Sequence, residues 1–222
     1  MLRRETLQLP ISYRYDLVVP QTTPAPLLVA LHGYGQDKGA ALRFARAADR
    51  HLRRDWTLAA LQAPHPHHVR KGEGLGAGFS WVSSHEPLED VRNHHLFLTH
   101  VMDEAHKEGL TDAPGAFLFG FSQSVSLNYR FAAAHPERVR GVVAVAGATP
   151  SNWAGDENVR LEPPVLHIAP TEDKAYPLSR ARRFKEQLTK RTQDVTWLEL
   201  PGEHRVPSAA YPRIGAWLEA RA

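Results

Sequence analysis

An apolar run meets a helical pattern at a serine in the stretch Ala116-Phe117-Leu118-Phe119-Gly120-Phe121-Ser122-Gln123-Ser124. Gly120 and Ser122 match the start of a G-x-S-x-G elbow, in which a strained strand-to-helix turn lifts a serine hydroxyl clear of a sheet. The last position of the motif is Ser124 instead of glycine, and its side chain is still small enough for tight packing. A serine just before a first helical turn is also a favoured N-cap. We predict that Ser122 is a nucleophile, with the N-cap as the alternative.

Short apolar runs bounded by turn residues recur on both sides of this stretch, and runs of this length suit strands buried on both faces. They cover residues 27–31, 56–61, 116–119, 141–146, 165–168 and 195–200. Segments with helical spacing lie between them, at residues 39–53, 88–107, 123–134, 178–190 and 207–220. Strands that alternate with helices predict an α/β fold with a mostly parallel central sheet and helices on both faces.

Two regions depart from this alternation. Residues 6–9 and 12–19 show partial alternation and precede a proline-rich turn, which predicts an antiparallel N-terminal strand pair. Residues 64–87 are rich in glycine and histidine and have no clear periodicity, so we expect an irregular loop there. A loop of that length in a compact domain is usually functional or mobile.

A nucleophilic serine needs a histidine as base and a carboxylate that orients the base, and in this kind of fold the acid precedes the histidine in the chain. Asp173 follows one predicted strand, and His204 follows the last one. Residues that follow parallel strands meet at the carboxyl edge of the sheet, where open α/β sheets bind ligands. We therefore expect Ser122, Asp173 and His204 to converge. Glu172 is the competing acid, and a turn aspartate and a surface histidine are the alternatives.

A glycine-rich turn follows the first central strand and reads His32-Gly33-Tyr34-Gly35. Glycine lets the backbone approach a ligand closely. One N–H of such a turn, together with the N–H of the residue after the nucleophile, would stabilise an oxyanion. We predict that these donors are the backbone N–H groups of Tyr34 and Gln123. A plain glycine turn is the alternative.

Other motifs in the chain carry weaker signals. Ser80 lies in a second Gly-Phe-Ser sequence, but no apolar run precedes it and bulky residues follow it, so we reject Ser80 as a nucleophile. The glycines around it do not join a strand directly to a helix, as a dinucleotide fingerprint would require. Five histidines could suggest zinc: His65, His67, His68, His94 and His95. They lack H-E-x-x-H spacing, so we expect no metal and interpret them as surface histidines.

Composition limits the class of protein. The chain has 222 residues and 42% hydrophobic content, which predicts a single domain over residues 1–222. There is no cysteine, which excludes disulfides and a cysteine nucleophile. The charge of +3 comes from scattered doublets, so no nucleic-acid partner is expected. Apolar runs fall far short of the roughly 20 residues of a membrane span. The start has no signal-peptide pattern, so we expect a cytoplasmic protein without a membrane span.

Together these motifs resemble the phospholipase/carboxylesterase family of α/β-hydrolases, which includes small bacterial carboxylesterases and acyl-protein thioesterases. The resemblance runs from residue 26 to the C-terminus. Its most specific elements are Leu31-His-Gly-Tyr-Gly35, Gly120-Phe-Ser-Gln123, the Asp173-x-x-x-Pro177 turn and Gly202-Glu-His204. Ser124 departs from the family pattern, and so does the pair Ala169-Pro170, where the family often carries a glycine before the acid.

The resemblance implies an α/β-hydrolase fold and a serine esterase that cleaves a small-molecule carboxylic ester through an acyl-enzyme. It assigns the triad to Ser122, Asp173 and His204 and requires no cofactor. A monomer or a homodimer is expected. The family usually covers its site with the segment equivalent to residues 64–87, so Phe79 and Trp81 are predicted to bind substrate, with an anchor to the core as the alternative for Trp81. A peptidase, a thioesterase and a non-catalytic binding protein on the same scaffold remain open.

Overall fold

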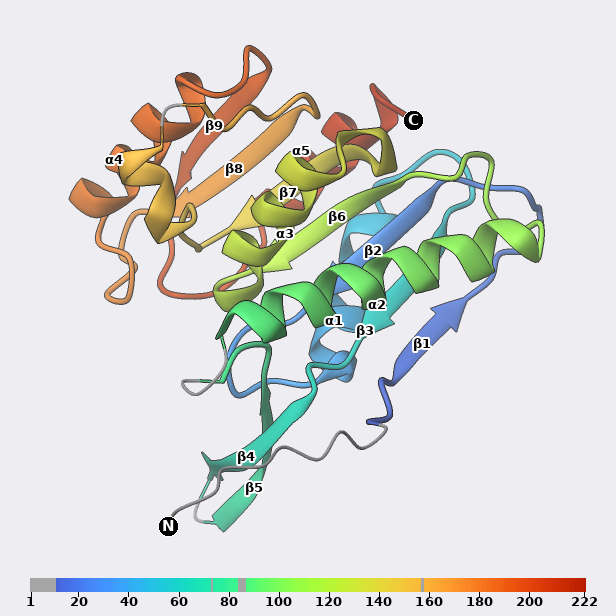
Figure 1. Cartoon of the computed structure of the whole chain (residues 1–222), viewed down its shortest axis with the longest axis horizontal. Helices are drawn as coiled ribbons and strands as arrows, with labels where there is room; N and C mark the ends of the chain where they lie inside the picture. Colours follow the sequence, from blue (N-terminus) through green and yellow to red (C-terminus); the bar gives the residue numbers. More distant parts are fainter. Residues whose placement is uncertain (1–10, 73, 84–86, 157) are drawn as a thin grey trace, which may run out of the picture.

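The computed structural model describes residues 11–72, 74–83, 87–156 and 158–222. Its centre is a seven-stranded sheet with the strand order β1-β3-β2-β6-β7-β8-β9 (Figure 1). The strands are β1 (Tyr15–Val18), β2 (Leu27–Leu31), β3 (Thr57–Leu61), β6 (Ala116–Phe121), β7 (Val139–Val145), β8 (Val165–Pro170) and β9 (Val195–Leu200). Strand β1 is antiparallel to β3, and the other neighbours are parallel. Each predicted apolar run forms a strand, so the α/β fold with a mostly parallel sheet is confirmed.

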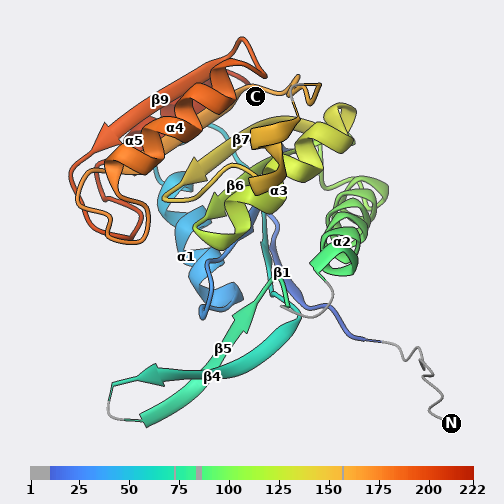
Figure 2. The same ribbon diagram turned by 60° about the vertical axis from the view of Figure 1, so that its left-hand side comes forward.

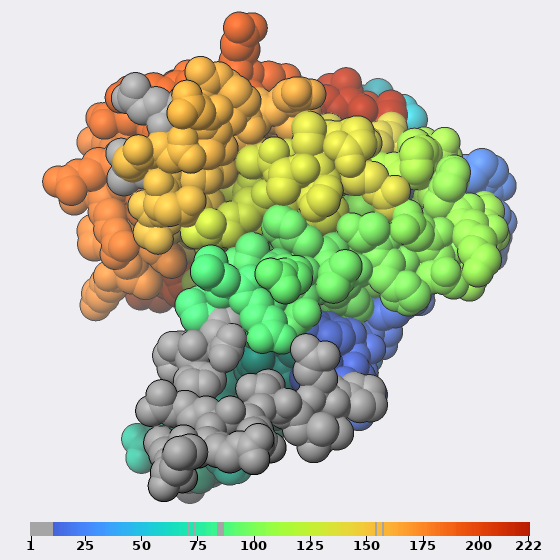
Figure 3. Space-filling view, viewed as in Figure 1, coloured from blue at the N-terminus to red at the C-terminus, as the bar shows by residue number. Residues whose placement is uncertain are grey.

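Helices cover both faces of this sheet. They are α1 (Lys38–Asp49), α2 (Pro87–Lys107), α3 (Gln123–Ala134), α4 (Leu178–Thr189) and α5 (Ala210–Glu219). In β2, Leu27, Val29 and Leu31 join the core shared with α2 and α3, and the space-filling view shows those helices over this face (Figure 3). Leu28 and Ala30 join the core shared with α1 and α5. Successive side chains of a strand point to opposite faces, so a wholly apolar strand is buried on both.

Residues 64–87 differ from the irregular loop that their sequence predicts. Strands β4 (His65–Lys71) and β5 (Gly74–Ser80) pair antiparallel as a separate two-stranded sheet, and this hairpin projects from the body of the protein (Figure 2). Glycine has low strand propensity and interrupts the alternation of side chains, which hides the hairpin in the sequence. Packing requires glycine at Gly78, because a Cβ there would lie 2.5 Å from Val69 Cγ1 and 2.7 Å from Gly35 O.

The predicted N-terminal strand pair falls partly outside the described residues, because residues 6–9 are not among them. The second segment of the pair forms β1, which pairs with β3 so that Tyr15 lies opposite Leu61 and Val18 opposite Leu58. Among the helices that the structure describes, none is both long enough and apolar enough to cross a lipid bilayer.

The interpretation of the histidines as surface residues is wrong for His94. Its side chain is 2% exposed, and its ring packs edge-on against Trp81 at a centroid distance of 5.7 Å. Burial lowers the pKa of His94 to about 3. His94 lies on the buried face of α2 with Phe97, Leu98 and Val101. These residues have the i, i+3, i+4, i+7 spacing of the apolar stripe of an amphipathic helix. A residue at such a position is buried even when its side chain is polar.

Candidate active site

Ser122 lies between the end of β6 and the start of α3, with φ 55° and ψ −111°. A positive φ is uncommon for a residue other than glycine, and it fits the strained turn of a nucleophile elbow. Gly120 provides the space for this turn, because a Cβ there would lie 2.9 Å from Asn128 Nδ2 and 3.2 Å from Val125 Cα. The Ser122 side chain makes no N-cap hydrogen bond, which the alternative assignment as a helix cap would require.

Ser124, which departs from the family motif, is accommodated by hydrogen bonds. It is fully buried, and its Oγ accepts the Phe121 N–H at 3.0 Å. The same Oγ lies 3.1 Å from Leu31 O and 3.0 Å from Phe121 O, and its one proton serves one of these carbonyls at a time. The hydroxyl therefore ties the elbow to the neighbouring strand β2.

The structure brings Ser122, His204 and Asp173 together. Ser122 Oγ lies 2.9 Å from His204 Nε2, and His204 Nδ1 lies 2.8 Å from Asp173 Oδ2. The three residues follow β6, β9 and β8, at the carboxyl ends of parallel strands. An ionised carboxylate can only accept, so Nδ1 of His204 donates and its Nε2 lone pair is left for the serine hydroxyl. In this arrangement the imidazole can accept the serine proton.

Burial and backbone contacts distinguish the two candidate acids. The Asp173 side chain is 0% exposed, and its Oδ1 accepts the N–H groups of Ala175 at 2.8 Å and Tyr176 at 2.9 Å. Glu172 is exposed, and its backbone N–H donates to Gly202 O at 2.8 Å. Asp173 is therefore the acid that contacts the imidazole, and Glu172 lies at the rim.

The two predicted oxyanion donors are available. Within the part of the chain that the structure describes, neither the Tyr34 N–H nor the Gln123 N–H has a hydrogen-bond partner. Gly33 brings the first of these segments against the nucleophile, since a Cβ on Gly33 would lie 3.2 Å from Ser122 Cβ. The Tyr34 side chain points outward and is 62% exposed. Both N–H groups are therefore free to donate to a further acceptor.

His32 orients the peptide that carries the Tyr34 N–H, a role that the sequence did not suggest. His32 Nε2 accepts the Ala63 N–H at 3.1 Å, so the ring proton is on Nδ1, which donates to Gly33 O at 2.7 Å. Burial lowers the pKa of His32, which favours the neutral ring that both hydrogen bonds require. The C=O and N–H of a trans peptide point in opposite directions, so holding Gly33 O also sets the direction of the Tyr34 N–H. The sequence feature that could have indicated this role is the histidine itself, which stands between an apolar strand and a glycine.

The two predicted substrate-binding residues lie at the base of the hairpin. Phe79 is half-buried, and its backbone O accepts the Gly35 N–H at 2.9 Å while its N–H donates to Gln36 O at 3.1 Å. Trp81 is 1% exposed and belongs to the hydrophobic core. This burial agrees with the alternative for Trp81, an anchor to the core, and its role as a wall of an acyl pocket stays an untested prediction.

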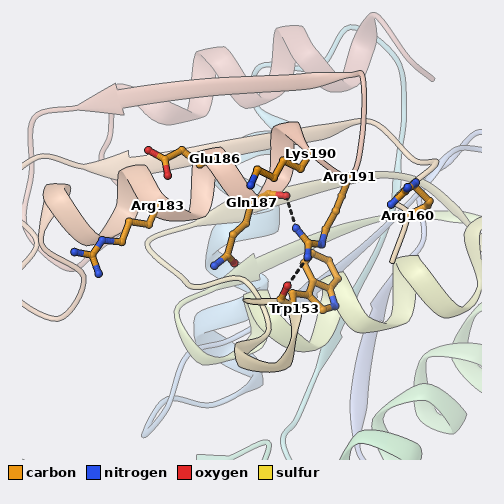
Figure 4. Close-up of a pocket in the computed structure, with 7 residues that line it drawn as sticks. All are labelled: Trp153, Arg160, Arg183, Glu186, Gln187, Lys190 and Arg191. Atoms are coloured by element: carbon orange, nitrogen blue, oxygen red, sulfur yellow. Dashed lines mark hydrogen bonds between the residues drawn. The ribbon is translucent and has the colours of Figure 1, made fainter. Parts of the chain in front are cut away.

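Two hollows on the surface are lined by different kinds of residue. A hollow of about 290 Å³ lies beside the triad and is lined by Glu172, Lys174, Glu203, His204 and Arg205. A hollow of about 470 Å³ lies between α4 and the 3₁₀ helix η2 (Ser151–Gly155), where Arg191 donates to the backbone carbonyls of Gln187 and Trp153 (Figure 4). It is lined by Trp153, Arg160, Arg183, Glu186, Gln187, Lys190 and Arg191. The smaller hollow contains His204, whereas this larger one contains no residue of the Ser122, His204 and Asp173 set.

Comparison with known proteins agrees with this architecture. A model of the phospholipase/carboxylesterase family matches residues 15–220. Similar solved structures include esterase PE8, with 20% identity and a TM-score of 0.75 over 96% of this chain and 100% of that chain. The Bacillus cereus carboxylesterase has 17% identity and a TM-score of 0.72 over 95% of each chain. A monoacylglycerol lipase from Paleococcus ferrophilus has 17% identity and a TM-score of 0.67 over 96% of this chain and 100% of that chain.

These structures show a shared fold, and the family model covers nearly the whole sequence. The chain therefore belongs to the phospholipase/carboxylesterase family of α/β-hydrolases.

Proposed function

We propose that this protein hydrolyses carboxylic esters of small molecules, with Ser122 as nucleophile, His204 as general base and Asp173 as the group that orients the base. The observation that carries the proposal is the pair of hydrogen bonds, 2.9 Å and 2.8 Å long, that joins the serine to the buried carboxylate through the imidazole. The positive φ of Ser122 and the absence of a capping bond support the nucleophilic role over a structural one.

Acylation begins when Ser122 Oγ attacks the ester carbonyl carbon and His204 Nε2 takes the hydroxyl proton. The carbonyl oxygen becomes an oxyanion, which the N–H groups of Tyr34 and Gln123 stabilise by roughly 3 to 4 kcal/mol each. The bond to the leaving oxygen then breaks, and His204 gives its proton to the departing alcohol. The acyl group remains on Ser122.

Deacylation repeats these steps with water as the nucleophile. His204 removes a proton from water, the hydroxide adds to the acyl carbon, and the proton returns to Ser122 Oγ as the acid leaves. Asp173 stabilises the imidazolium that forms in each half-reaction. Its two backbone hydrogen bonds hold the carboxylate in place, so the imidazole keeps one orientation throughout the cycle.

The ester is the proposed substrate class because the similar solved structures are named as an esterase, a carboxylesterase and a monoacylglycerol lipase. A thioester or an amide could enter the same cycle, since a triad does not specify the bond. We also propose that Phe79, half-buried at the base of the hairpin, contacts the acyl chain.

The test is hydrolysis of p-nitrophenyl esters from acetate to palmitate by the wild type and by Ser122→Ala. We expect turnover by the wild type alone, and the preferred chain length will separate a small-ester enzyme from a lipid enzyme. A fluorophosphonate should label the wild type and not the variant. Equal inertness of the two proteins toward esters would contradict the proposal. In that case, loss of labelling in the variant would indicate a thioesterase or peptidase, and no labelling of either protein would indicate a non-catalytic scaffold.

A further inference from the structure

Trp81 makes two hydrogen bonds that connect two separate segments of the site. Its backbone N–H donates to Gln123 Oε1 at 3.0 Å, and its indole Nε1–H donates to His32 O at 2.8 Å. The residue is 1% exposed, and its bond to His32 O is fully buried. Tryptophan usually finds a partner for its N–H when buried, and here the partner belongs to a functional turn.

Each of these two partners belongs to a segment that carries a proposed oxyanion donor. Gln123 begins α3, and its own backbone N–H is one donor. His32 begins the turn that presents the other donor, the N–H of Tyr34, and its ring holds the intervening Gly33 carbonyl at 2.7 Å. Trp81 therefore contacts both halves of the oxyanion hole through groups other than the donors themselves, which stay free.

Further contacts fix the position of Trp81. Its ring lies against the His32 ring at a centroid distance of 5.2 Å and against the edge of His94 at 5.7 Å. The preceding residue is also tied to the elbow, because Gln123 Nε2 donates to Ser80 Oγ at 2.9 Å. Ser80 Oγ in turn donates to Val82 O at 2.8 Å. The segment is thus held on several sides and can act as a rigid spacer.

We propose that Trp81 is a positioning residue that sets the separation of the Tyr34 and Gln123 N–H donors. This inference rests on the proposed function, because it gives those two groups the oxyanion role. The donors act on the charge that develops in the tetrahedral intermediate and less on the neutral ester. Loss of the spacer should therefore lower kcat and leave KM nearly unchanged, which a defect in general packing would not do selectively.

The test compares Trp81→Phe with Trp217→Phe. Phenylalanine at position 81 keeps a buried ring and the backbone bond to Gln123, and it removes the indole donor to His32 O together with part of the ring volume, a loss of volume that Trp217→Phe shares. Trp217 is the matched control because it is a buried tryptophan of the opposite face, 7% exposed, whose Nε1 has no hydrogen-bond partner within the described chain. Each variant is assayed for kcat and KM on the best p-nitrophenyl ester, for inhibition by a trifluoromethyl ketone that forms a tetrahedral adduct, and for Tm.

For Trp81→Phe we expect a fall in kcat of about 10-fold to 100-fold, somewhat less than the loss of a whole oxyanion donor. We expect the inhibition constant of the ketone to rise by a similar factor and KM to change less than about twofold, as for a contact made only in the transition state. Trp217→Phe should keep the kcat and the ketone affinity of the wild type, and the Tm of each variant shows that it is folded. If the two variants have the same kcat, the inference is overturned while the esterase proposal stands.

A second variant protects the test against misfolding of the first. Gln123→Met keeps the length of the side chain and the backbone N–H of residue 123, and it removes the bonds to Trp81 N and Ser80 Oγ. The same selective loss of kcat and ketone affinity is expected. Unchanged kinetics in a folded Gln123→Met protein would overturn the spacer role. A wild type as inert as Ser122→Ala would overturn the proposed function and the inference together.

Discussion

Two Gly-Phe-Ser sequences lie side by side in this molecule, and only one of them forms an elbow. At Gly120-Phe121-Ser122 the serine has φ 55°, and its Oγ faces the His204 ring at 2.9 Å. At Gly78-Phe79-Ser80 the serine ends a hairpin strand, and its proton goes to Val82 O at 2.8 Å. The two meet where Gln123 Nε2 donates to Ser80 Oγ.

The difference between the two serines comes from what surrounds them. Strand β6 lies inside the parallel sheet and leads directly into α3, so Ser122 is raised at the carboxyl edge where His204 also emerges. Strand β5 pairs with β4 outside the parallel sheet, and the bulky Trp81 and Val82 follow its serine in place of a helix. The same three residues therefore present a serine hydroxyl to an imidazole in one place and make a structural hydrogen bond in the other.

Replacing each serine by alanine gives the largest contrast. Ser122→Ala should lower kcat by about 10⁴-fold or more, because loss of a triad nucleophile removes the covalent pathway. Ser80→Ala should lower kcat by less than about tenfold, because one neutral hydrogen bond contributes about 1 kcal/mol. Steady-state hydrolysis of a p-nitrophenyl ester measures both. Comparable losses in the two variants would show that the hairpin serine takes part in the chemistry.

A buried and an exposed histidine of the same helix should also differ, in how acid changes the free energy of unfolding. Behind the hairpin, burial lowers the pKa of His94 to about 3, so between pH 6.5 and pH 3 the unfolded chain binds a proton that the folded chain does not. Stability is therefore lost as pH falls, by about 1.4 kcal/mol per unit for this residue. In urea unfolding at pH 6, 5 and 4, the unfolding free energy of His94→Phe should fall less steeply than that of the wild type, by about 1.4 kcal/mol per pH unit. His100→Phe, an exposed histidine of the same helix, is the control and should behave like the wild type.

Replacing the glycine of each Gly-Phe-Ser sequence by alanine should affect stability and kcat to different extents. Gly120→Ala forces a Cβ against Asn128 and Val125 inside the core and should cost about 2 kcal/mol of unfolding free energy, as overpacking does. Gly78→Ala forces a Cβ against Gly35 O and Val69 Cγ1, which belong to the turn after β2 and to the hairpin and lie outside the central sheet. We expect a smaller loss of stability and a clear loss of kcat, because Gly35 belongs to the turn that carries the proposed donor N–H of Tyr34. Urea midpoints and kcat of both variants measure this; equal stability losses would contradict the expected difference between the two sites.

Ser124→Gly should have the smallest effect and would restore the family motif. It removes the hydroxyl that bonds Phe121 N–H and reaches Leu31 O. We expect the variant to be less stable by about 1 to 2 kcal/mol, since a buried hydrogen bond is lost and glycine is unfavourable in a helix. Its kcat should stay within about twofold of the wild type, since the hydroxyl does not face the substrate. A more stable variant would mean that the hydroxyl strains the elbow.

Local pattern was enough to predict much of this protein. The apolar runs, the helical spacing and the order of Ser122, Asp173 and His204 indicated both the parallel sheet and the residues at its carboxyl edge. These features depend on short-range periodicity and on chain order, which a single sequence carries directly. The position of each triad member after its own strand is one such feature.

Other features depended on contacts between distant segments. Strand pairing in the hairpin, the burial of His94 and the choice of Asp173 over Glu172 all needed the tertiary structure, and so did the two hydrogen bonds of Trp81. In each case the deciding partner is far away in the chain: Gly35 for Gly78, Trp81 for His94, His204 for Asp173. Sequence by itself determined where the strands of the parallel sheet and the helices run, and which residues follow those strands at the candidate site, because these features follow from local periodicity and chain order. Only the tertiary structure decided which surfaces hold those residues in place, because that depends on register and close packing between segments with no local signal.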